Sequence, residues 1–224
     1  MGVKVRKLIV GLLICVSLYG SEFEDAVKAC DNKDARACFN LGRVYYIGEV
    51  VQQDISKAME FFQKACDNGE AAGCYNLGVM YRLEGMNKDI FKVVKLYKKA
   101  CDGGNVKGCY NLGVIYKNGE GLKQDNFKAI EYFKKTCDKG TIGFHYNYDV
   151  IYAGCTYLGN MYKDGKGVKQ NNFKAVELYQ KACDGELSEG CFNLGIMYEF
   201  GTGVKQDYQK ALWFYGKACD MKLE

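Results

Sequence analysis

Cysteines recur along this chain in pairs, and the pairs recur at a nearly constant interval. In four pairs the two cysteines are eight residues apart, and a fifth pair has the same pattern with ten residues inserted. The pairs are Cys30/Cys38, Cys66/Cys74, Cys101/Cys109, Cys137/Cys155 and Cys183/Cys191. Their first members follow one another at about 36 residues, apart from the longer interval that holds the insertion. A period of this length is the signature of a repeat architecture, in which each unit buries its apolar face against its neighbours.

The segment after each second cysteine is repeated nearly unchanged. It reads CYNLGVMY from Cys74 and CYNLGVIY from Cys109. Its Cys, Leu and Tyr fall at i, i+3 and i+7, which is one face of a helix. A glycine beside that face costs about 1 kcal/mol in a helix interior, so its recurrence predicts close contact with another helix. These glycines are Gly42, Gly78, Gly113, Gly159 and Gly195.

A glycine-rich loop and a second helix complete the repeat. The loop reads GKGVKQN or GTGVKQD and lacks the Lys-Ser/Thr ending of a phosphate-binding loop, so we interpret it as a turn. It ends in Asp or Asn, which we expect to cap the next helix, at Asp54, Asp89, Asp125, Asn171 and Asp207. In that helix a small residue precedes an aromatic one by four positions, as in Ala58 and Phe62, which predicts a tight helix seam.

The cysteine content indicates disulfides and an oxidising compartment. A short turn brings the two cysteines of each pair together, and we predict the bridges Cys30–Cys38, Cys66–Cys74, Cys101–Cys109, Cys137–Cys155 and Cys183–Cys191. Each should contribute about 2 to 3 kcal/mol through loop closure. Cys219 has no partner eight residues on, which leaves two interpretations: an intermolecular bridge that links a dimer, or an incomplete last repeat.

The N-terminus is typical of a signal peptide. Lys4, Arg6 and Lys7 precede an apolar stretch from Leu8 to Leu18, which is too short to span a bilayer. We expect residues 1–20 to be removed and the remaining chain to be secreted or periplasmic. That chain carries 28 basic and 27 acidic residues, so its charge gives no reason to expect nucleic acid or a membrane as partner.

These motifs carry a family resemblance. The pattern L-G-x-x-Y, G-x-G-V-x-x-D and K-A-x-x-x-Y/F-x-K-A-C resembles the Sel1-like repeat, a relative of the tetratricopeptide repeat, and the cysteine pairs resemble the Helicobacter cysteine-rich protein family. The resemblance implies an all-α fold, an α/α superhelical solenoid stapled by disulfides. It divides residues 21–224, a single repeat domain, into a half unit, 21–37, and repeats 38–73, 74–108, 109–154, 155–190 and 191–224. The chain departs from the pattern at insertion 141–152, at Val93 for Ala and at Tyr157 for Asn.

The resemblance implies two different functions. Sel1-like repeats are protein-interaction scaffolds, whereas the cysteine-rich family is described as penicillin-binding or β-lactamase proteins. No serine has a lysine three places later, and Thr136, which has that spacing to Lys139, occupies an ordinary helix position. His145 is the only histidine, too few for a zinc site, so we expect no metal and no cofactor. The catalytic residues of any hydrolase remain unassigned, and we favour a scaffold over an enzyme that would act on β-lactam antibiotics.

Two groups of residues are candidates for ligand binding. The first is a row of carboxamides on the concave face, Asn40, Asn76, Asn111 and Asn193, which could bind the amide backbone of a peptide, a protein or a peptidoglycan or β-lactam-like ligand. The alternative is that these asparagines form a hydrogen-bond ladder between repeats. The second group lies in the insertion: Phe144, His145, Tyr146 and Tyr148. Insertions in solenoids map to loops on one face, although these aromatics could equally cover a lengthened turn.

Overall fold

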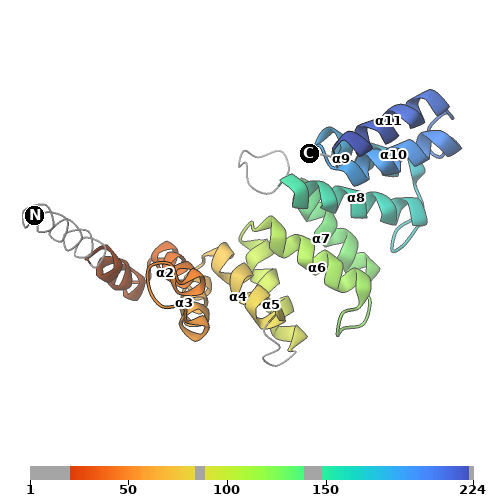
Figure 1. The fold of residues 1–224 in the computed structure, drawn as a ribbon. Coiled ribbons are helices and arrows are strands. Elements are labelled where there is room, and N and C mark those ends of the chain that lie inside the picture. The colour runs from red at the N-terminus through yellow and green to blue at the C-terminus, as the bar shows by residue number, and fades with distance from the viewer. Residues whose placement is uncertain (1–20, 84–88, 139–147, 222–224) are drawn as a thin grey trace, which may run out of the picture. The chain divides into compact units, whose positions relative to one another are not determined.

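The computed structural model describes residues 21–83, 89–138 and 148–221, which consist of helices and connecting turns (Figure 1). The all-α solenoid expected from the repeat is confirmed. The described helices belong to two compact units, Met1–Lys88 and Asp89–Glu224. The proposed signal segment, residues 1–20, and the insertion residues Phe144, His145 and Tyr146 lie outside the described residues.

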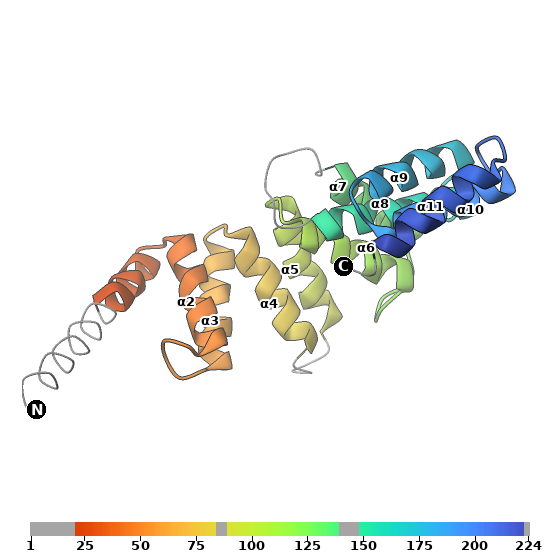
Figure 2. The same ribbon diagram turned by 45° about the horizontal axis from the view of Figure 1, so that its top comes forward.

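Each unit is a series of antiparallel helices that run back and forth (Figures 1 and 2). Residues 21–31 are helical and precede three helices of the first unit: α2 (Ala35–Ile47), α3 (Ile55–Asp67) and α4 (Ala71–Leu83). The second unit contains α5 (Ile90–Asp102), α6 (Val106–Asn118), α7 (Asn126–Asp138), α8 (Tyr148–Asp164), α9 (Asn172–Asp184), α10 (Ser188–Phe200) and α11 (Tyr208–Asp220). The even-numbered helices carry the L-G-x-x-Y motif and are called A helices here; the odd-numbered helices from α3 on are the B helices.

The turns between A and B helices are built as the sequence predicts. The side chain of Asp54 accepts a hydrogen bond from the Lys57 amide at 2.9 Å, and Asp89, Asp125, Asn171 and Asp207 cap their helices in the same way. The glutamine before each of three of these caps bonds to the end of the preceding A helix. In the fourth repeat, Gln170 Nε2 donates to the Lys163 carbonyl at 2.8 Å. Gln53 and Gln206 do the same for the carbonyls of Tyr46 and Glu199.

The glycines of the A helices form the predicted close contacts. A Cβ at Gly113 would lie 2.6 Å from the Phe133 ring, and a Cβ at Gly42 would lie 2.6 Å from the Phe62 ring. Gly159 and Gly195 meet Tyr179 and Tyr215 in the same manner. The aromatic rings on α3, α7, α9 and α11 therefore each fit into a notch that only glycine leaves open.

A second aromatic pair closes three of the helix hairpins. The tyrosine of the L-G-x-x-Y motif stacks on an aromatic side chain of the following B helix: Tyr45 on Phe61 at 5.5 Å, Tyr116 on Tyr132 at 5.8 Å and Tyr198 on Phe214 at 5.5 Å. Burial raises the pKa of Tyr132 to about 12.

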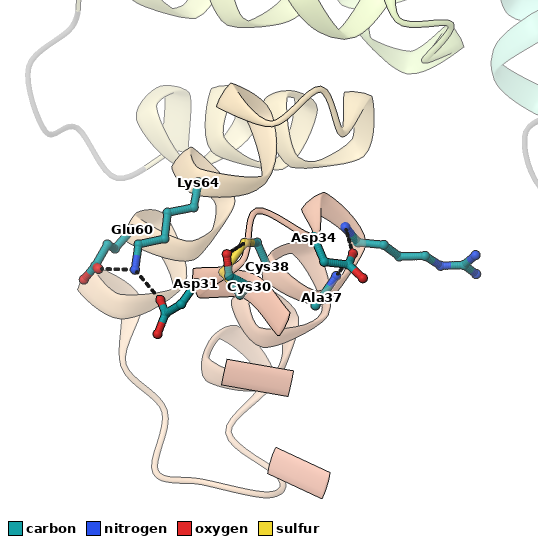
Figure 3. Close-up of a disulfide and its surroundings, with 8 residues drawn as sticks. Cys30, Asp31, Asp34, Ala37, Cys38, Glu60 and Lys64 are labelled. Carbon is teal, nitrogen blue, oxygen red and sulfur yellow. Dashed lines mark hydrogen bonds and ion pairs between the residues drawn. A yellow bond between two sulfur atoms is a disulfide. The ribbon is translucent and has the colours of Figure 1, made fainter. Parts of the chain in front are cut away.

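Disulfides join the end of one helix to the start of the next. The bonded pairs are Cys30–Cys38, Cys66–Cys74, Cys101–Cys109, Cys137–Cys155 and Cys183–Cys191, with Cα atoms 4.4 to 4.8 Å apart. Beside the first bridge, Asp34 caps α2 and Lys64 lies 3.7 Å from Asp31 and 3.2 Å from Glu60 (Figure 3). In the second unit, Lys181 donates across repeats to the Cys137 carbonyl at 2.8 Å, which places a cation at a helix C-terminus.

The insertion differs from the expectation of a loop in its last residues. Helix α8 begins at Tyr148 and has 17 residues, whereas the other A helices have 13. The four residues 148–151 therefore extend the helix by about one turn. Tyr148 stacks on Tyr152 at 6.1 Å, and Tyr152 packs over Gly185 in the following turn. This packing favours the helical conformation of the segment, because it partly buries Tyr152 against the turn of the next repeat.

Candidate functional site

The first unit contains a groove of about 340 Å³ between two successive A helices, α2 and α4. The floor is the ring of Phe62 on α3, which is buried and held by the notch at Gly42. Its lining consists of Arg43, Tyr46, Ile47, Phe62, Asn76, Val79, Met80 and Leu83. Tyr46 and Ile47 are each 46% exposed and Leu83 is 73% exposed, so the groove has an apolar rim as well as an apolar floor.

Two polar side chains stand in this apolar setting. Asn76 is half-buried in the wall formed by α4, and Arg43 is exposed on α2. In the described part of the chain, neither side chain forms a hydrogen bond or an ion pair with another residue. Among residues 21–83 of this unit, no aspartate or glutamate lines the groove. The groove thus offers a carboxamide, which can donate and accept, and a guanidinium, which donates, beside an apolar surface.

The predicted asparagine row is distributed over both units. Asn40 is exposed on α2 and does not line the groove, whereas Asn76 does. Asn111 on α6 and Asn193 on α10 are half-buried in the second unit. No hydrogen bond of these four carboxamides is found within residues 21–83, 89–138 and 148–221. The ladder between repeats that we considered as an alternative is therefore not seen there.

Tyr157, which replaces asparagine in the fourth repeat, fills the corresponding space in the second unit. Its ring stacks on Phe133 at 5.1 Å with an interplanar angle of 9°. The Lys117 ammonium lies 5.0 Å from the centre of the same ring, and Tyr110 lies 5.9 Å away. Burial, and to a lesser extent the neighbouring Tyr157, raise the pKa of Tyr110 to about 12. The sequence shows that Tyr157 replaces the asparagine found at this position in the other repeats. It does not show that the tyrosine ring fills the space between α6 and α8.

The remaining predicted residues do not gather at the groove. Tyr148 belongs to the second unit and stacks on Tyr152, as described above. The hydroxyl of Thr136 is buried and donates to the Tyr132 carbonyl at 2.9 Å, so this residue takes part in packing. Among the described residues, no three or more His, Cys, Asp or Glu side chains cluster as metal ligands would.

Sequence reasoning missed a row of exposed phenylalanines on the B helices. Phe91, Phe127 and Phe173 occupy the same position in three successive repeats and are 71% to 76% exposed. Phe173 also lines a wide open groove of about 830 Å³, together with Lys169 and Lys205 of two neighbouring loops. The equivalent residues Ser56 and Gln209 are polar. The signal was present in the repeated Phe-Lys pair near the start of these helices, but a phenylalanine in a helix is usually interpreted as core.

These features define an α/α repeat scaffold with an apolar groove on its A helices. The Sel1 repeat family matches the chain in five successive stretches: 35–70, 71–105, 106–141, 153–186 and 188–223. These matches cover most of the sequence, and the chain belongs to the Sel1 repeat family. No curated protein matches the chain in sequence.

Solved structures share the fold. A protective antigen of uropathogenic Escherichia coli with an SLR fold is 30% identical, with a TM-score of 0.77 over 87% of this chain and 40% of that one. This chain therefore spans less than half the length of the antigen. A Sel1 repeat protein from Oxalobacter formigenes is 24% identical, with a TM-score of 0.76 over 84% of this chain and 74% of that one. Helicobacter pylori cysteine rich protein B is 33% identical over 64% of this chain and 97% of that one, with a TM-score of 0.47.

Proposed function

We propose that this protein is a secreted or periplasmic scaffold that binds a peptide segment, from a protein or from a cell-wall stem, along its A helices. The α2–α4 groove is the main contact. The observation that carries this proposal is the pair Asn76 and Arg43, two side chains without protein partners in the described residues, on the wall of an apolar groove. Sel1 repeats generally bind proteins, which agrees with a binding role.

The chemistry of the groove suits an extended peptide. A carboxamide can donate to a backbone carbonyl and accept from a backbone amide, so Asn76 can satisfy a peptide bond that has lost its water. The apolar floor and rim supply the hydrophobic contribution, at about 25 cal/mol per Å² of apolar surface removed from water. A groove of about 340 Å³ lies near the lower end of the range for ligand sites, about 300 to 1,000 Å³.

The disulfides support an exported location. Five bridges form and persist in an oxidising compartment, and none of the described helices is both long and apolar enough to cross a membrane. We propose that residues 1–20 direct export and are removed. N-terminal sequencing of the exported protein should then begin near Ser21 or Glu22, and Met1 in the exported pool would contradict the proposal.

The paired cysteines eight residues apart also favour membership in the Helicobacter cysteine-rich branch of the family. Nothing among the described residues supports the β-lactam hydrolysis that this resemblance implies. Turnover of a chromogenic cephalosporin by the oxidised protein is the corresponding assay. Its rate should not exceed that of the buffer.

A peptide array tests the proposed function. Oxidised protein is incubated with an array of random-sequence dodecapeptides, and binding is compared for the wild type, Asn76→Ala and Asn40→Ala. Loss of one buried hydrogen bond, about 0.5 to 1.5 kcal/mol, should weaken binding by Asn76→Ala about 2- to 12-fold at unchanged melting temperature. Asn40 lies outside the groove on α2, so its variant is the matched control. Failure of the wild type to bind any peptide, or equal losses in both variants, would contradict the proposal.

A further inference from the structure

The last B helix, α11, exposes a side that the other B helices cover. Counted from the first residue of each B helix, positions 1, 5, 8 and 12 lie on one side of the helix, because they are three or four residues apart. In α3, α5, α7 and α9 every residue at these positions is buried or half-buried. In α11 Tyr208 is 62% exposed, Leu212 is 64% exposed and Cys219 is exposed, while Tyr215 is half-buried. We call these four residues the α11 face.

In the earlier repeats this side is covered by the next A helix and its loop. A Cβ at Gly203, in the loop after α10, would lie 2.5 Å from the carbonyl oxygen of Asn172 at position 1 of α9. At position 12 of α9, Cys183 is bonded to Cys191 of α10. Cys219 has the same position in α11 and is a free thiol. The α11 face is thus a repeat-stacking surface that no helix of the described residues covers.

The α11 face is suited to contact with its own copy because it carries no charge. Its four positions hold two tyrosines, a leucine and a cysteine. Position 9, which borders the face, holds Gly216, whereas α5 and α7 have Lys98 and Lys134 there. In a two-fold contact each charge meets the same charge of the other copy, and like charges oppose association. This repulsion is absent from α11, and a Cβ at Gly216 would meet no heavy atom within 4 Å.

The free thiol determines which partner can complete the face. A disulfide at Cys219 requires a second unpaired thiol, and the other cysteines of the described residues are bonded in five pairs. A second copy of the chain brings such a thiol at the same place on the same face. Two identical faces that meet in this way form a closed two-fold dimer.

We propose that two copies of this protein associate through the α11 face and are joined by a disulfide between their Cys219 residues. Leu212 and Tyr208 of each copy pack against α11 of the other. The contact is one helix face wide, smaller than the about 800 Å² per partner of a stable interface, so the dimer depends on the disulfide. This inference does not depend on peptide binding in the α2–α4 groove.

Formation of the bridge requires an oxidant, and oxidised glutathione or a protein disulfide can supply it by exchange. The Cys219 thiolate of one copy attacks the glutathione disulfide and releases one glutathione thiolate. The Cys219 thiolate of the second copy then attacks the mixed disulfide and releases the other. Two protein thiols are oxidised, two glutathione thiols are formed, and the two protons pass from the former to the latter.

The test measures dimer formation in a glutathione redox buffer that leaves the five structural bridges intact. The full-length oxidised protein carries Cys15→Ser, so that Cys219 is the one cysteine outside the five pairs. Non-reducing electrophoresis and mass spectrometry separate the dimer from the glutathione adduct of Cys219. The protein with an unchanged α11 face should form the dimer, and full reduction of Cys219 should return it to a monomer. A protein that forms the glutathione adduct but no dimer at any glutathione ratio would overturn the proposal.

Leu212→Lys and Trp213→Lys are a matched pair that ties the dimer to the face. The two residues are adjacent and are 64% and 60% exposed, and α5 has Lys95 at the position of Trp213, so both variants should fold. Leu212 lies on the α11 face, whereas Trp213 lies about 100° further round the helix and packs on Phe214. Leu212→Lys should lower the equilibrium constant for dimer formation at least about 10-fold, and Trp213→Lys should leave it within about 2-fold. Equal dimer formation in both variants and the parent protein would show that Cys219 pairs without the face, and the proposal would be wrong.

Hydrogen exchange provides a second readout that the disulfide alone would not change. The amides of α11 should exchange more slowly in the dimer than in the monomeric glutathione adduct, because the second copy covers the α11 face. The amides of α9, whose corresponding side is already covered by α10, should exchange equally in both. A disulfide-linked dimer without added protection of α11 would also overturn the proposal.

Discussion

Substitution of glycine by alanine should have opposite effects at two helical positions of this protein. At Gly216 in α11 an added Cβ meets no heavy atom within 4 Å. Gly216→Ala should therefore stabilise the protein by about 1 kcal/mol, the difference in helix propensity between the two residues. At Gly113 the same methyl group would lie 2.6 Å from Phe133 Cε1 and 2.7 Å from Cδ1, about 1 Å closer than carbon atoms normally approach.

The Phe133 ring cannot move away easily. It is fully buried, and Tyr157 stacks on it at 5.1 Å. Overpacking of this kind costs about 1 to 3 kcal/mol, so after the gain in propensity Gly113→Ala should destabilise the protein by about 1 kcal/mol. The same substitution should thus differ by about 2 kcal/mol between the two positions. The change in stability caused by Gly42→Ala should lie between those of Gly216→Ala and Gly113→Ala, because the Phe62 ring borders the groove and can shift into it.

Urea denaturation of the oxidised proteins, followed by far-UV circular dichroism, measures these free energies. A second variant tests the mechanism: Phe133→Leu should cost less in the Gly113→Ala background than in the wild type, with a coupling energy of about 1 kcal/mol. If Gly113→Ala stabilises the protein as much as Gly216→Ala, the ring does not occupy the glycine notch and the reasoning is wrong.

Three further results are expected. Removal of the Cys137–Cys155 bridge by paired alanine substitutions should lower the free energy of unfolding by about 3.2 kcal/mol, and removal of Cys101–Cys109 by about 2.6 kcal/mol, because the first bridge closes the longer ring. Denaturant unfolding measures both losses, and the reverse order would contradict the loop-closure argument. Cys219 is the free, exposed thiol of the described residues, so non-reducing electrophoresis should show a dimer that Cys219→Ala abolishes; a wild type that stays monomeric under oxidising conditions would contradict this. Tyr110 and Tyr132 have pKa values raised to about 12, so the folded state holds their protons more tightly than the unfolded state. The contribution of these protons to stability should be constant below about pH 10 and fall between pH 10 and 12. Absorbance titration of phenolate together with circular dichroism would detect this, and normal ionisation near pH 10 without unfolding would refute it.

Much of the fold follows from the sequence because its determinants are local and repeated. The caps at Asp54 and Asp207 act on amides three residues away, and the glycine notches recur with their aromatic partners at constant spacing. A signal that occurs five times is hard to misinterpret. The helical start of α8 was harder to foresee, because it depends on Tyr152 packing over Gly185, a contact specific to one repeat.

The candidate site was only partly predictable for a related physical reason. The sequence places Asn76 on the A-helix face and shows Tyr157 as the exception in the row. Whether the missing ring leaves an open groove depends on how close α2, α3 and α4 pack, and on Tyr46, Ile47 and Leu83 remaining exposed. Volumes of this kind result from packing and are not encoded at any one position.

The short disulfide rings have a consequence for proteolysis. Each ordinary bridge spans eight residues around a turn. Two of these rings contain exposed or partly exposed basic residues: Lys33 in the turn before α2, and Arg36 and Lys107 in the first turns of α2 and α6. Turns with such residues are the sites that trypsin-like proteases cut first. A cut inside a ring opens the backbone but leaves both ends covalently attached through the sulfur atoms. The Cys30–Cys38 and Cys101–Cys109 bridges thus lie where a nick leaves the neighbouring helices joined, and the protein can remain one connected molecule after cleavage there.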